Sequence, residues 1–377
     1  MRMHALAKDV GQLFVMGIGG PTLDDRSRAL LRDKRVSGVI LFKRNIDSLE
    51  QVVALNADIV GAAPADAPAL ISVDQEGGRV ARLRGICTDV PAMRAVGKLA
   101  RGDDDLPYRV GAMMARELSS LGFHMDFAPV LDVDTNPANP VIGERSFSRD
   151  PHEVARFGAR MIQGMQQAGV AACGKHFPGH GDTDTDSHLA LPRLPHAMDR
   201  LDTIELVPFA AAIEAGVASI MTAHVAFPAL DDKLPATLSH DVLTVLLRDR
   251  LGFEGVIVSD DLEMKGVADH FEVEEMVSLG LAAGVDLFLV CKDQDKLERA
   301  IAAAEKAVVD GEVSRARVEA ALARVTRMKE RFIGAPAPPT LDEARRLVRA
   351  APHQELAARL FAVDEVSTRA ASVVDAI

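Results

Sequence analysis

The feature that most limits the possible fold is a repeating alternation of short apolar runs with longer amphipathic segments. Apolar runs followed by helical segments indicate a parallel sheet that is covered on both faces. Eight such units in about 300 residues predict a closed (β/α)8 barrel, the TIM-type α/β fold, rather than an open sheet. The runs that we predict as strands are residues 12–18, 37–42, 69–74, 125–132, 170–176, 219–224, 256–260 and 285–291. Segments with apolar residues at three- and four-residue spacing are predicted helices: 47–60, 108–121, 151–167, 199–215 and 240–250.

A proline-rich stretch divides the chain near its C-terminal end. The sequence GAPAPPT at residues 334–340 contains three prolines, which is typical of a stiff, non-helical linker. Before it, residues 314–332 have the pattern of one more amphipathic helix, so we expect a single barrel domain over residues 1–333. After it, residues 341–349 and 354–361 have helical patterns. Residues 334–377 are therefore expected to form a linker and a short helical C-terminal extension.

The composition argues against partners such as nucleic acid and membranes. The 377-residue chain has a formal net charge of −12, 4% aromatic residues and no Trp. Nucleic-acid-binding proteins usually show a basic excess and aromatic stacking surfaces instead. No apolar stretch approaches the roughly 20 residues that a membrane-spanning helix needs.

The cysteines and the N-terminal region bear on the location of the protein. Cys87, Cys173 and Cys291 are far apart and show no CxxC spacing. Disulfides are therefore not expected, and we predict a reducing, cytoplasmic location. Residues 13–20 are apolar, but the run is short and lacks a small-residue cleavage site, so it predicts a strand rather than a secretion signal.

Polar side chains lie at the ends of five predicted strands. In a barrel, the C-terminal strand ends and the loops after them form the active-site face. Several such residues on one rim therefore predict a catalytic or binding site there. These residues are Asp74, Asp132, Lys175 with His176, His224 and Asp260.

The segment VIVSDDLEM at residues 256–264 brings two adjacent carboxylates, Asp260 and Asp261, to a strand end. A carboxylate in this place can attack an anomeric carbon, hold a metal ion or cap the next helix. Position alone does not separate these roles. With two neighbouring Asp residues, one can cap the helix while the other points inward.

The segment KHFPGHGDTDTDSH at residues 175–188 gathers three His, three Asp and one Lys. A metal site is disfavoured, because Pro178 and Gly179 break any helix that would align His176 with His180. A Schiff base at Lys175 would need a depressed pKa, whereas nearby carboxylates would favour the charged ammonium.

A third interpretation makes the same segment an acid/base and sugar-binding loop. Lys175 and His176 would donate hydrogen bonds to a substrate hydroxyl, and Asp186 would orient His188. An imidazole with a near-neutral pKa can protonate a leaving oxygen and then deprotonate water. His188 could equally be a polar loop residue without a role in the chemistry. Gly179 and Gly181 predict that this loop moves.

Two arginine-containing segments complete the set of candidates. VDQEGGRVARL at residues 73–83 places Asp74 before Arg79 and Arg82, and GERSF at residues 143–147 contains Arg145. Asp can accept from two vicinal hydroxyls, and Arg offers a rigid fork of donors. Each segment alone could be a surface salt-bridge cluster. The phosphate-binding pattern GxxxxGK[ST] is absent.

In combination, DQEGGRV, GERSF, KHFPGHGDT…DSH and SDDLEM closely resemble glycoside hydrolase family 3. The resemblance covers about residues 10–333 and is closest to the single-domain bacterial β-N-acetylglucosaminidases, or β-hexosaminidases, of peptidoglycan recycling. It implies a retaining enzyme that removes terminal β-linked N-acetylglucosamine without a cofactor or a metal. It also implies residue roles: Asp260 as nucleophile, His188 with Asp186 as acid/base, and Asp74, Arg82, Arg145, Lys175 and His176 as sugar contacts.

An imidazole in the acid/base role does not decide whether water or phosphate receives the glycosyl group in the second step. Retaining glycosidases generally use two carboxyl groups about 5 Å apart. An imidazole would not repel an anionic phosphate, so phosphorolysis stands beside hydrolysis. A metal-dependent hydrolase and a non-catalytic sugar-binding barrel are alternatives of other classes. The joint presence of Asp186, His188 and Asp260 argues against a pure binder. The expected partner is a GlcNAc-containing muropeptide or oligosaccharide, bound by a monomer or homodimer.

Overall fold

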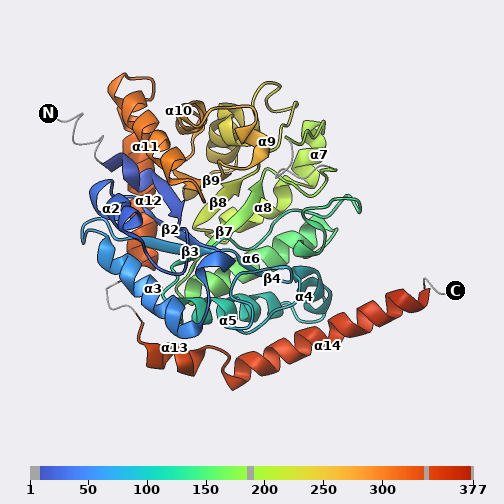
Figure 1. Ribbon diagram of the computed structural model, residues 1–377. Helices are drawn as coiled ribbons and strands as arrows, with labels where there is room; N and C mark the ends of the chain where they lie inside the picture. The colour runs from blue at the N-terminus through green and yellow to red at the C-terminus, as the bar shows by residue number, and fades with distance from the viewer. Residues whose placement is uncertain (1–8, 185–190, 335–338, 375–377) are drawn as a thin grey trace.

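The computed structural model describes residues 9–184, 191–334 and 339–374. Eight parallel strands close into a barrel in the order β1-β10-β9-β8-β7-β6-β3-β2, so neighbours in the sheet follow one another along the chain (Figure 1). The predicted TIM-type barrel is confirmed, and each strand lies within or next to its predicted run. The strands are β1 Phe14–Gly17, β2 Gly38–Leu41, β3 Leu70–Val73, β6 Met125–Asp126, β7 Ala171–Phe177, β8 Ser219–Thr222, β9 Val256–Asp261 and β10 Leu287–Val290.

Strand β6 is much shorter than the predicted run 125–132. Pro129 has no backbone N–H, so it cannot donate to a regular ladder. The segment still follows β7, because the N–H groups of Cys173 and Lys175 donate to Ala128 O and Pro129 O at 2.9 and 3.2 Å. Asp132 therefore still reaches the rim of the barrel. A short hairpin, β4 Gln75–Gly77 and β5 Val80–Ala81, follows β3.

Helices surround the barrel (Figure 1). The helices before β7, the fifth strand of the barrel, are α2 Asp25–Asp33, α3 Leu49–Ala62, α4 Met93–Ala100, α5 Leu106–Ser120 and α6 Pro151–Gln167. After the fifth strand come α7 Met198–Thr203, α8 Leu206–Glu214, a π-helix at Asp241–Arg250, α9 Lys265–Ala268, α10 Val273–Ala283, α11 Gln294–Val309 and α12 Arg315–Phe332. Short 3-10 turns lie at Val10–Leu13, Lys43–Asn45, Gly143–Arg145 and Ala236–Leu238.

The helix predicted over residues 199–215 is wrong in one respect, because the chain forms two helices there. Ile204 between α7 and α8 has the non-helical angles φ −127° and ψ −73°. Pro208 explains the break, since a proline ring clashes with the carbonyl four residues earlier and cannot donate to it. The N-terminus of α6, in contrast, is set by local signals. Asp150 accepts from His152 N at 2.8 Å, and Pro151 occupies the first turn.

Alternate strand residues pack into two separate apolar layers. One layer lies between the strands and the helices. The other layer includes apolar residues of α12. Lys329 of α12 donates to Gln12 Oε1 and to Pro68 O, and these two residues precede β1 and β3 in the chain. Helix α12 therefore packs at the N-terminal end of the barrel. The second layer includes Val15, Ile40, Leu70, Met125, Cys173, Met221, Val258 and Leu289 from the strands, with Val325, Met328 and Phe332 from α12. All three cysteines are buried and free.

The C-terminal extension consists of α13 Leu341–Leu347 and α14 Ala351–Val374. Helix α13 contacts α3 and α5, and α14 passes α4 before it extends away from the barrel (Figure 1). Glu117 of α5 holds the junction, because it accepts from Arg349 N at 2.9 Å and from His353 Nδ1 at 2.7 Å. The division into a barrel domain and an extension at residue 334 remains a prediction.

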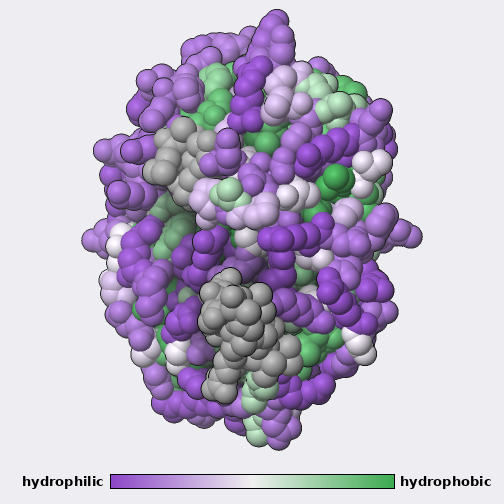
Figure 2. All heavy atoms as spheres, turned by 90° about the vertical axis from the view of Figure 1, so that its right-hand side faces the viewer, coloured by the Kyte–Doolittle hydropathy of each residue, from purple (hydrophilic) through white to green (hydrophobic). Residues whose placement is uncertain are grey.

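One face of the molecule shows how hydrophilic and apolar residues are distributed on the surface. Figure 2 shows a face that is mostly hydrophilic, with apolar residues in small separate patches. Within the described ranges, no helix combines the length and the apolar content that crossing a membrane requires.

Candidate active site

Polar residues at the C-terminal strand ends converge as predicted. Lys175 on β7 reaches across the rim to Asp74 after β3, with 2.8 Å between Nζ and Oδ1. On the same strand, His176 contacts Asp132, which follows β6. His224 after β8 lies 3.0 Å from the carbonyl oxygen of Asp261 on β9. The strand-end rule therefore identified side chains that lie on one face of the barrel.

A buried network of ion pairs forms around Lys175. Its ammonium lies 2.6 Å from Glu76 as well as 2.8 Å from Asp74, and the Lys175 and Glu76 side chains are each 3% exposed. Arg145 binds Glu76 through two hydrogen bonds of 2.8 Å. Arg82 lies 3.8 Å from Asp74. Four of the five predicted sugar contacts, Asp74, Arg82, Arg145 and Lys175, thus belong to one network.

The charges of this network stabilise one another. Burial alone would favour neutral Glu76, but Arg145 and Lys175 hold the pKa of its carboxyl well below the usual range. Burial would likewise favour the neutral amine of Lys175, but Asp74 and Glu76 raise the pKa of Lys175 above its ordinary value. The lysine is therefore a cation, as predicted from its acidic neighbours, and is unsuited to Schiff-base formation.

The hairpin after β3 explains why Glu76 points into the site. Gln75 N donates to Asp126 Oδ1 at 2.9 Å, and Leu83 N donates to Gln75 Oε1 at 3.0 Å. The turn itself needs glycine. Gly78 has φ +54°, and a Cβ atom there would lie 2.8 Å from Ala92 Cα. The EGG motif thus presents a carboxylate on a tight turn fixed against β6.

His176, the fifth predicted sugar contact, is fixed by Asp132. The Asp132 carboxylate accepts from His176 Nδ1 at 2.7 Å and from His180 N at 2.6 Å. Burial would raise the pKa of Asp132, but His176 and His180 lower it below its ordinary value. Burial and the neighbouring His176 lower the pKa of His180 to about 4, so His180 is neutral near pH 7.

Asp260 and Asp261 are adjacent in sequence and differ in ionisation. Burial would raise the pKa of Asp260, but His224, His176, the Asp261 N–H and Lys175 leave it below the ordinary value. Burial and the charge of Glu263 raise the pKa of Asp261 to about 7. Asp261 Oδ1 faces the backbone N–H groups of Glu263 and Cys291 at 3.1 and 3.3 Å. Asp261 thus binds backbone at the turn, while Asp260 is the ionised carboxylate.

The predicted acid/base residues Asp186 and His188 lie outside the described residues, and so does the middle of the loop predicted to move. Three further residues of the site have no specific role predicted from the sequence. Glu76 lies within the DQEGGRV motif, and Asp132 and His224 stand at strand ends, so a signal was present for each. Their partners come from distant parts of the chain, which sequence spacing does not reveal.

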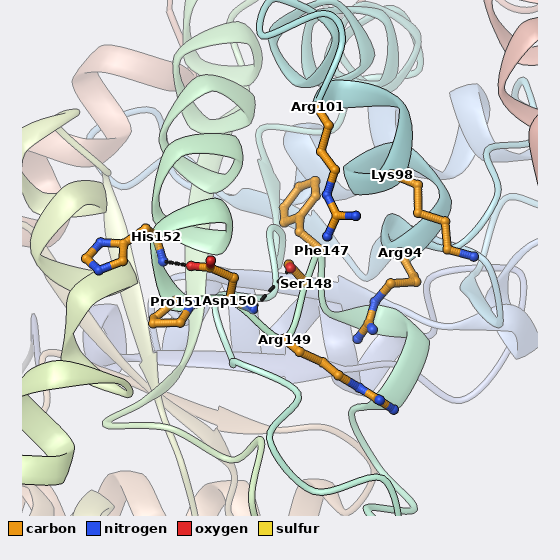
Figure 3. A pocket seen from close by; sticks show the side chains of 9 residues that line it. All are labelled: Arg94, Lys98, Arg101, Phe147, Ser148, Arg149, Asp150, Pro151 and His152. Carbon is orange, nitrogen blue, oxygen red and sulfur yellow. Dashed lines mark hydrogen bonds between the residues drawn. The ribbon is translucent and has the colours of Figure 1, made fainter.

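Two further features of the surface and the site bear on ligands. Within residues 9–184, 191–334 and 339–374, no three His, Cys, Asp or Glu side chains cluster as metal ligands. A hollow of about 570 Å³ lies at the N-terminus of α6 (Figure 3). Its arginines are paired, Arg94 with Asp134 at 2.7 Å and Arg101 with Glu153 at 2.8 Å. The hollow contains none of the network around Lys175.

Comparison with known proteins assigns the family. Residues 5–328 match the N-terminal domain of glycosyl hydrolase family 3. The chain belongs to glycosyl hydrolase family 3. The β-hexosaminidase of Chromobacterium violaceum is 41% identical over 293 residues, which are 77% of this chain and 81% of that protein. The β-hexosaminidase of Thiobacillus denitrificans is 39% identical over 343 residues, 90% of this chain and 92% of that protein.

Solved structures of family 3 agree with this assignment. A β-N-acetylglucosaminidase of the family from a Paenibacillus species has a TM-score of 0.90 and 44% identity, covering 94% of this chain and 68% of that one. NagZ from Neisseria gonorrhoeae has a TM-score of 0.78 and 32% identity, covering 93% and 97%. Another structure of the same NagZ is a complex with N-trifluoroacetyl-D-glucosamine. The resemblance inferred from four motifs is confirmed, and the protein is a glycoside hydrolase.

Proposed function

We propose that the protein is a retaining exo-β-N-acetylglucosaminidase that removes terminal, non-reducing β-linked GlcNAc. The observation that supports this most is the state of Asp260, a half-buried carboxylate near the end of β9 whose pKa His224, His176 and Lys175 hold below its ordinary value. An ionised carboxylate on the active-site rim is what a glycosidase nucleophile requires. The names of the relatives, β-hexosaminidase and β-N-acetylglucosaminidase, support the sugar.

The proposed reaction has two steps. In the first, an Asp260 oxygen attacks the anomeric carbon, the glycosidic C–O bond breaks, and His188 gives its proton to the leaving oxygen. In the second, His188 takes a proton from water, the water oxygen attacks the anomeric carbon, and the ester bond to Asp260 breaks. Two displacements at one carbon retain its configuration. Asp186 holds the His188 ring in the required tautomer and stabilises its cation.

The ion-pair network is the proposed sugar-binding part of the site. Asp74 and Lys175 can accept from and donate to neighbouring hydroxyls, with Arg82 and His176 at its edges. Arg145 already binds Glu76 twice and donates to Val141 O at 3.1 Å. We therefore propose that Arg145 acts both on the sugar and on Glu76, which orients Lys175. As natural substrates we propose GlcNAc-containing muropeptides or oligosaccharides in the cytoplasm, with no cofactor.

Replacing the nucleophile tests the proposal. Asp260→Ala should reduce turnover of an aryl β-N-acetylglucosaminide by several orders of magnitude while the thermal midpoint stays close to that of the native protein. Residual turnover within tenfold of the native enzyme would contradict the role of Asp260. The matching aryl β-glucoside should react far more slowly than the N-acetylglucosaminide. Adding phosphate tests the acceptor, because faster turnover with release of sugar 1-phosphate would replace hydrolysis by phosphorolysis.

A further inference from the structure

The loop of residues 82–92 lies between the hairpin of the site and the C-terminal extension. It leads from β5 to α4, and its residues Thr88 and Val90 are buried. On one side the loop is bonded to the hairpin that carries Glu76, and on the other side it is bonded to the extension. The loop is therefore in contact with both.

The contacts with the hairpin lie directly beside Glu76. Gly78 N donates to Val90 O at 2.9 Å. Gly77 packs so closely against the loop that a Cβ atom there would lie 2.8 Å from Pro91 O. These two glycines follow Glu76 in the chain, so the position of the loop helps to determine where the Glu76 carboxylate points.

The contacts with the extension lie in the middle of the loop. Arg349 NH1 donates to Gly85 O at 3.1 Å. Gln354 Nε2 of α14 donates to Thr88 Oγ1 at 3.2 Å. Thr88 in turn donates to the buried Glu117 carboxylate of α5, from N at 2.7 Å and from Oγ1 at 2.6 Å. Because Arg349 N donates to the same carboxylate, the extension is bonded both to the loop and to the group that anchors the loop on α5.

The Glu76 carboxylate responds to small movements of its turn. It is buried and lies 2.6 Å from the Lys175 ammonium and 2.8 Å from the Arg145 guanidinium. Hydrogen bonds between charged groups are short and depend on geometry. A displaced turn would therefore change both contacts at once, whereas Asp260 on β9 lies outside this route.

We propose that the C-terminal extension holds the loop of residues 82–92 against the hairpin, so that Arg349 and Gln354 act as positioning residues for Glu76. The effect on substrate rests on the proposed function, because it takes Glu76 as the group that orients Lys175. The extension, which shows no catalytic motif in its sequence, thereby takes part in sugar binding. The hairpin is also bonded to β6, so losing the contacts with the extension should loosen the turn without unfolding it.

The double variant Arg349→Ala/Gln354→Ala removes both side-chain bonds to the loop and leaves the residues of the site unchanged. We expect KM for an aryl β-N-acetylglucosaminide to rise about threefold to tenfold, while kcat changes less than about twofold. Arg345→Ala is the matched control, because Arg345 is an exposed arginine of the extension that binds Glu50 of α3 at 3.0 Å. This control should leave both constants unchanged. An unchanged KM in the double variant, or the same rise in Arg345→Ala, would overturn the positioning role.

Hydrogen exchange tests the link between the extension and the hairpin without a substrate. The Gly78 N–H is bonded to Val90 O in the native protein, so a loosened loop should speed exchange in a peptide that spans residues 75–81. A peptide that spans residues 256–261, from β9, is the internal reference and should exchange at the native rate. Exchange of the first peptide at the native rate in Arg349→Ala/Gln354→Ala would refute the link, whatever the substrate.

A variant of Glu76 separates this inference from the proposed function. If Glu76→Gln alone leaves KM unchanged, the proposed role of the network in sugar binding is wrong. If Glu76→Gln raises KM, adding Arg349→Ala and Gln354→Ala should cause little further rise, because the bond between charged groups that they position is already lost. Independent, multiplying effects on KM would mean that the extension acts by another route and would refute the positioning role alone.

Discussion

Replacing Glu76 with Gln removes one charge from the network around Lys175 and keeps the shape of the side chain. In the native protein the carboxylates of Asp74 and Glu76 face the cations Lys175 and Arg145. The variant leaves one buried cation without a counter-charge. The new amide still offers one acceptor, but its NH2 group faces donors of Lys175 or Arg145.

The cost of this change follows from burial. Removing one partner of a buried ion pair costs about 3 to 5 kcal/mol, since the remaining charge stays desolvated. Lys175 keeps Asp74 at 2.8 Å, so we expect the free energy of unfolding to fall by about 3 kcal/mol, at the lower end of that range. Equilibrium unfolding in urea at pH 7 should show a lower midpoint with an unchanged slope.

An exposed ion pair with the same geometry provides the control. Arg299 binds Glu274 through hydrogen bonds of 2.7 and 2.8 Å, and the two side chains are 51% and 46% exposed. Because water solvates both charges, Glu274→Gln should leave the urea midpoint unchanged within error. A Glu76→Gln protein as stable as the Glu274→Gln protein would refute the view that burial makes this network matter.

Two other changes test groups outside the network around Lys175. Since the pKa of Asp261 is raised from its ordinary 3.8 to about 7, the stability that its protonated form contributes is full below about pH 4 and is lost as the pH rises to 7. The thermal midpoint of Asp261→Asn should therefore rise relative to that of the native protein as the pH increases from 4 to 7. A difference between the two midpoints that does not change with pH would contradict the raised pKa of Asp261. His353→Ala removes one donor from the buried Glu117 carboxylate and should lower the free energy of unfolding by about 2 kcal/mol. A fall in urea of less than about 0.5 kcal/mol would show that the junction with the extension does not need this bond.

Local chemistry explains which parts of the fold could be predicted from the sequence. Helix α6 begins and ends within the predicted range, because Asp150 caps it and Pro151 suits its first turn. The differences from the prediction have equally local causes. Pro129 shortens the strand predicted over residues 125–132, and Pro208 divides the helix predicted over residues 199–215. The pattern of apolar residues predicts both elements, but it does not show that a proline has no backbone N–H group to donate.

The site was predictable in its positions but not in its pairings. The rule that strand ends converge located Asp74, Lys175 and Asp260. It could not show that Glu76 pairs with Arg145, 69 residues later in the chain. Nor could it separate Asp260 from its neighbour Asp261. Their pKa values move in opposite directions because β7 and β8 bring cationic groups to one carboxyl, whereas Glu263 faces the other.

Strand β7 links the network around Lys175 to Asp260, so a substitution in that network can change the pKa of Asp260. Lys175 belongs to the proposed sugar-binding network, and its charge also helps to lower the pKa of Asp260, the proposed nucleophile. Neutralising Lys175 should therefore weaken the proposed sugar contact and raise the pKa of Asp260, the proposed nucleophile. Glu76→Gln is different, because Asp74 still favours the charged ammonium. Asp260 should stay ionised, so we expect this variant to raise KM for an aryl N-acetylglucosaminide much more than it lowers kcat.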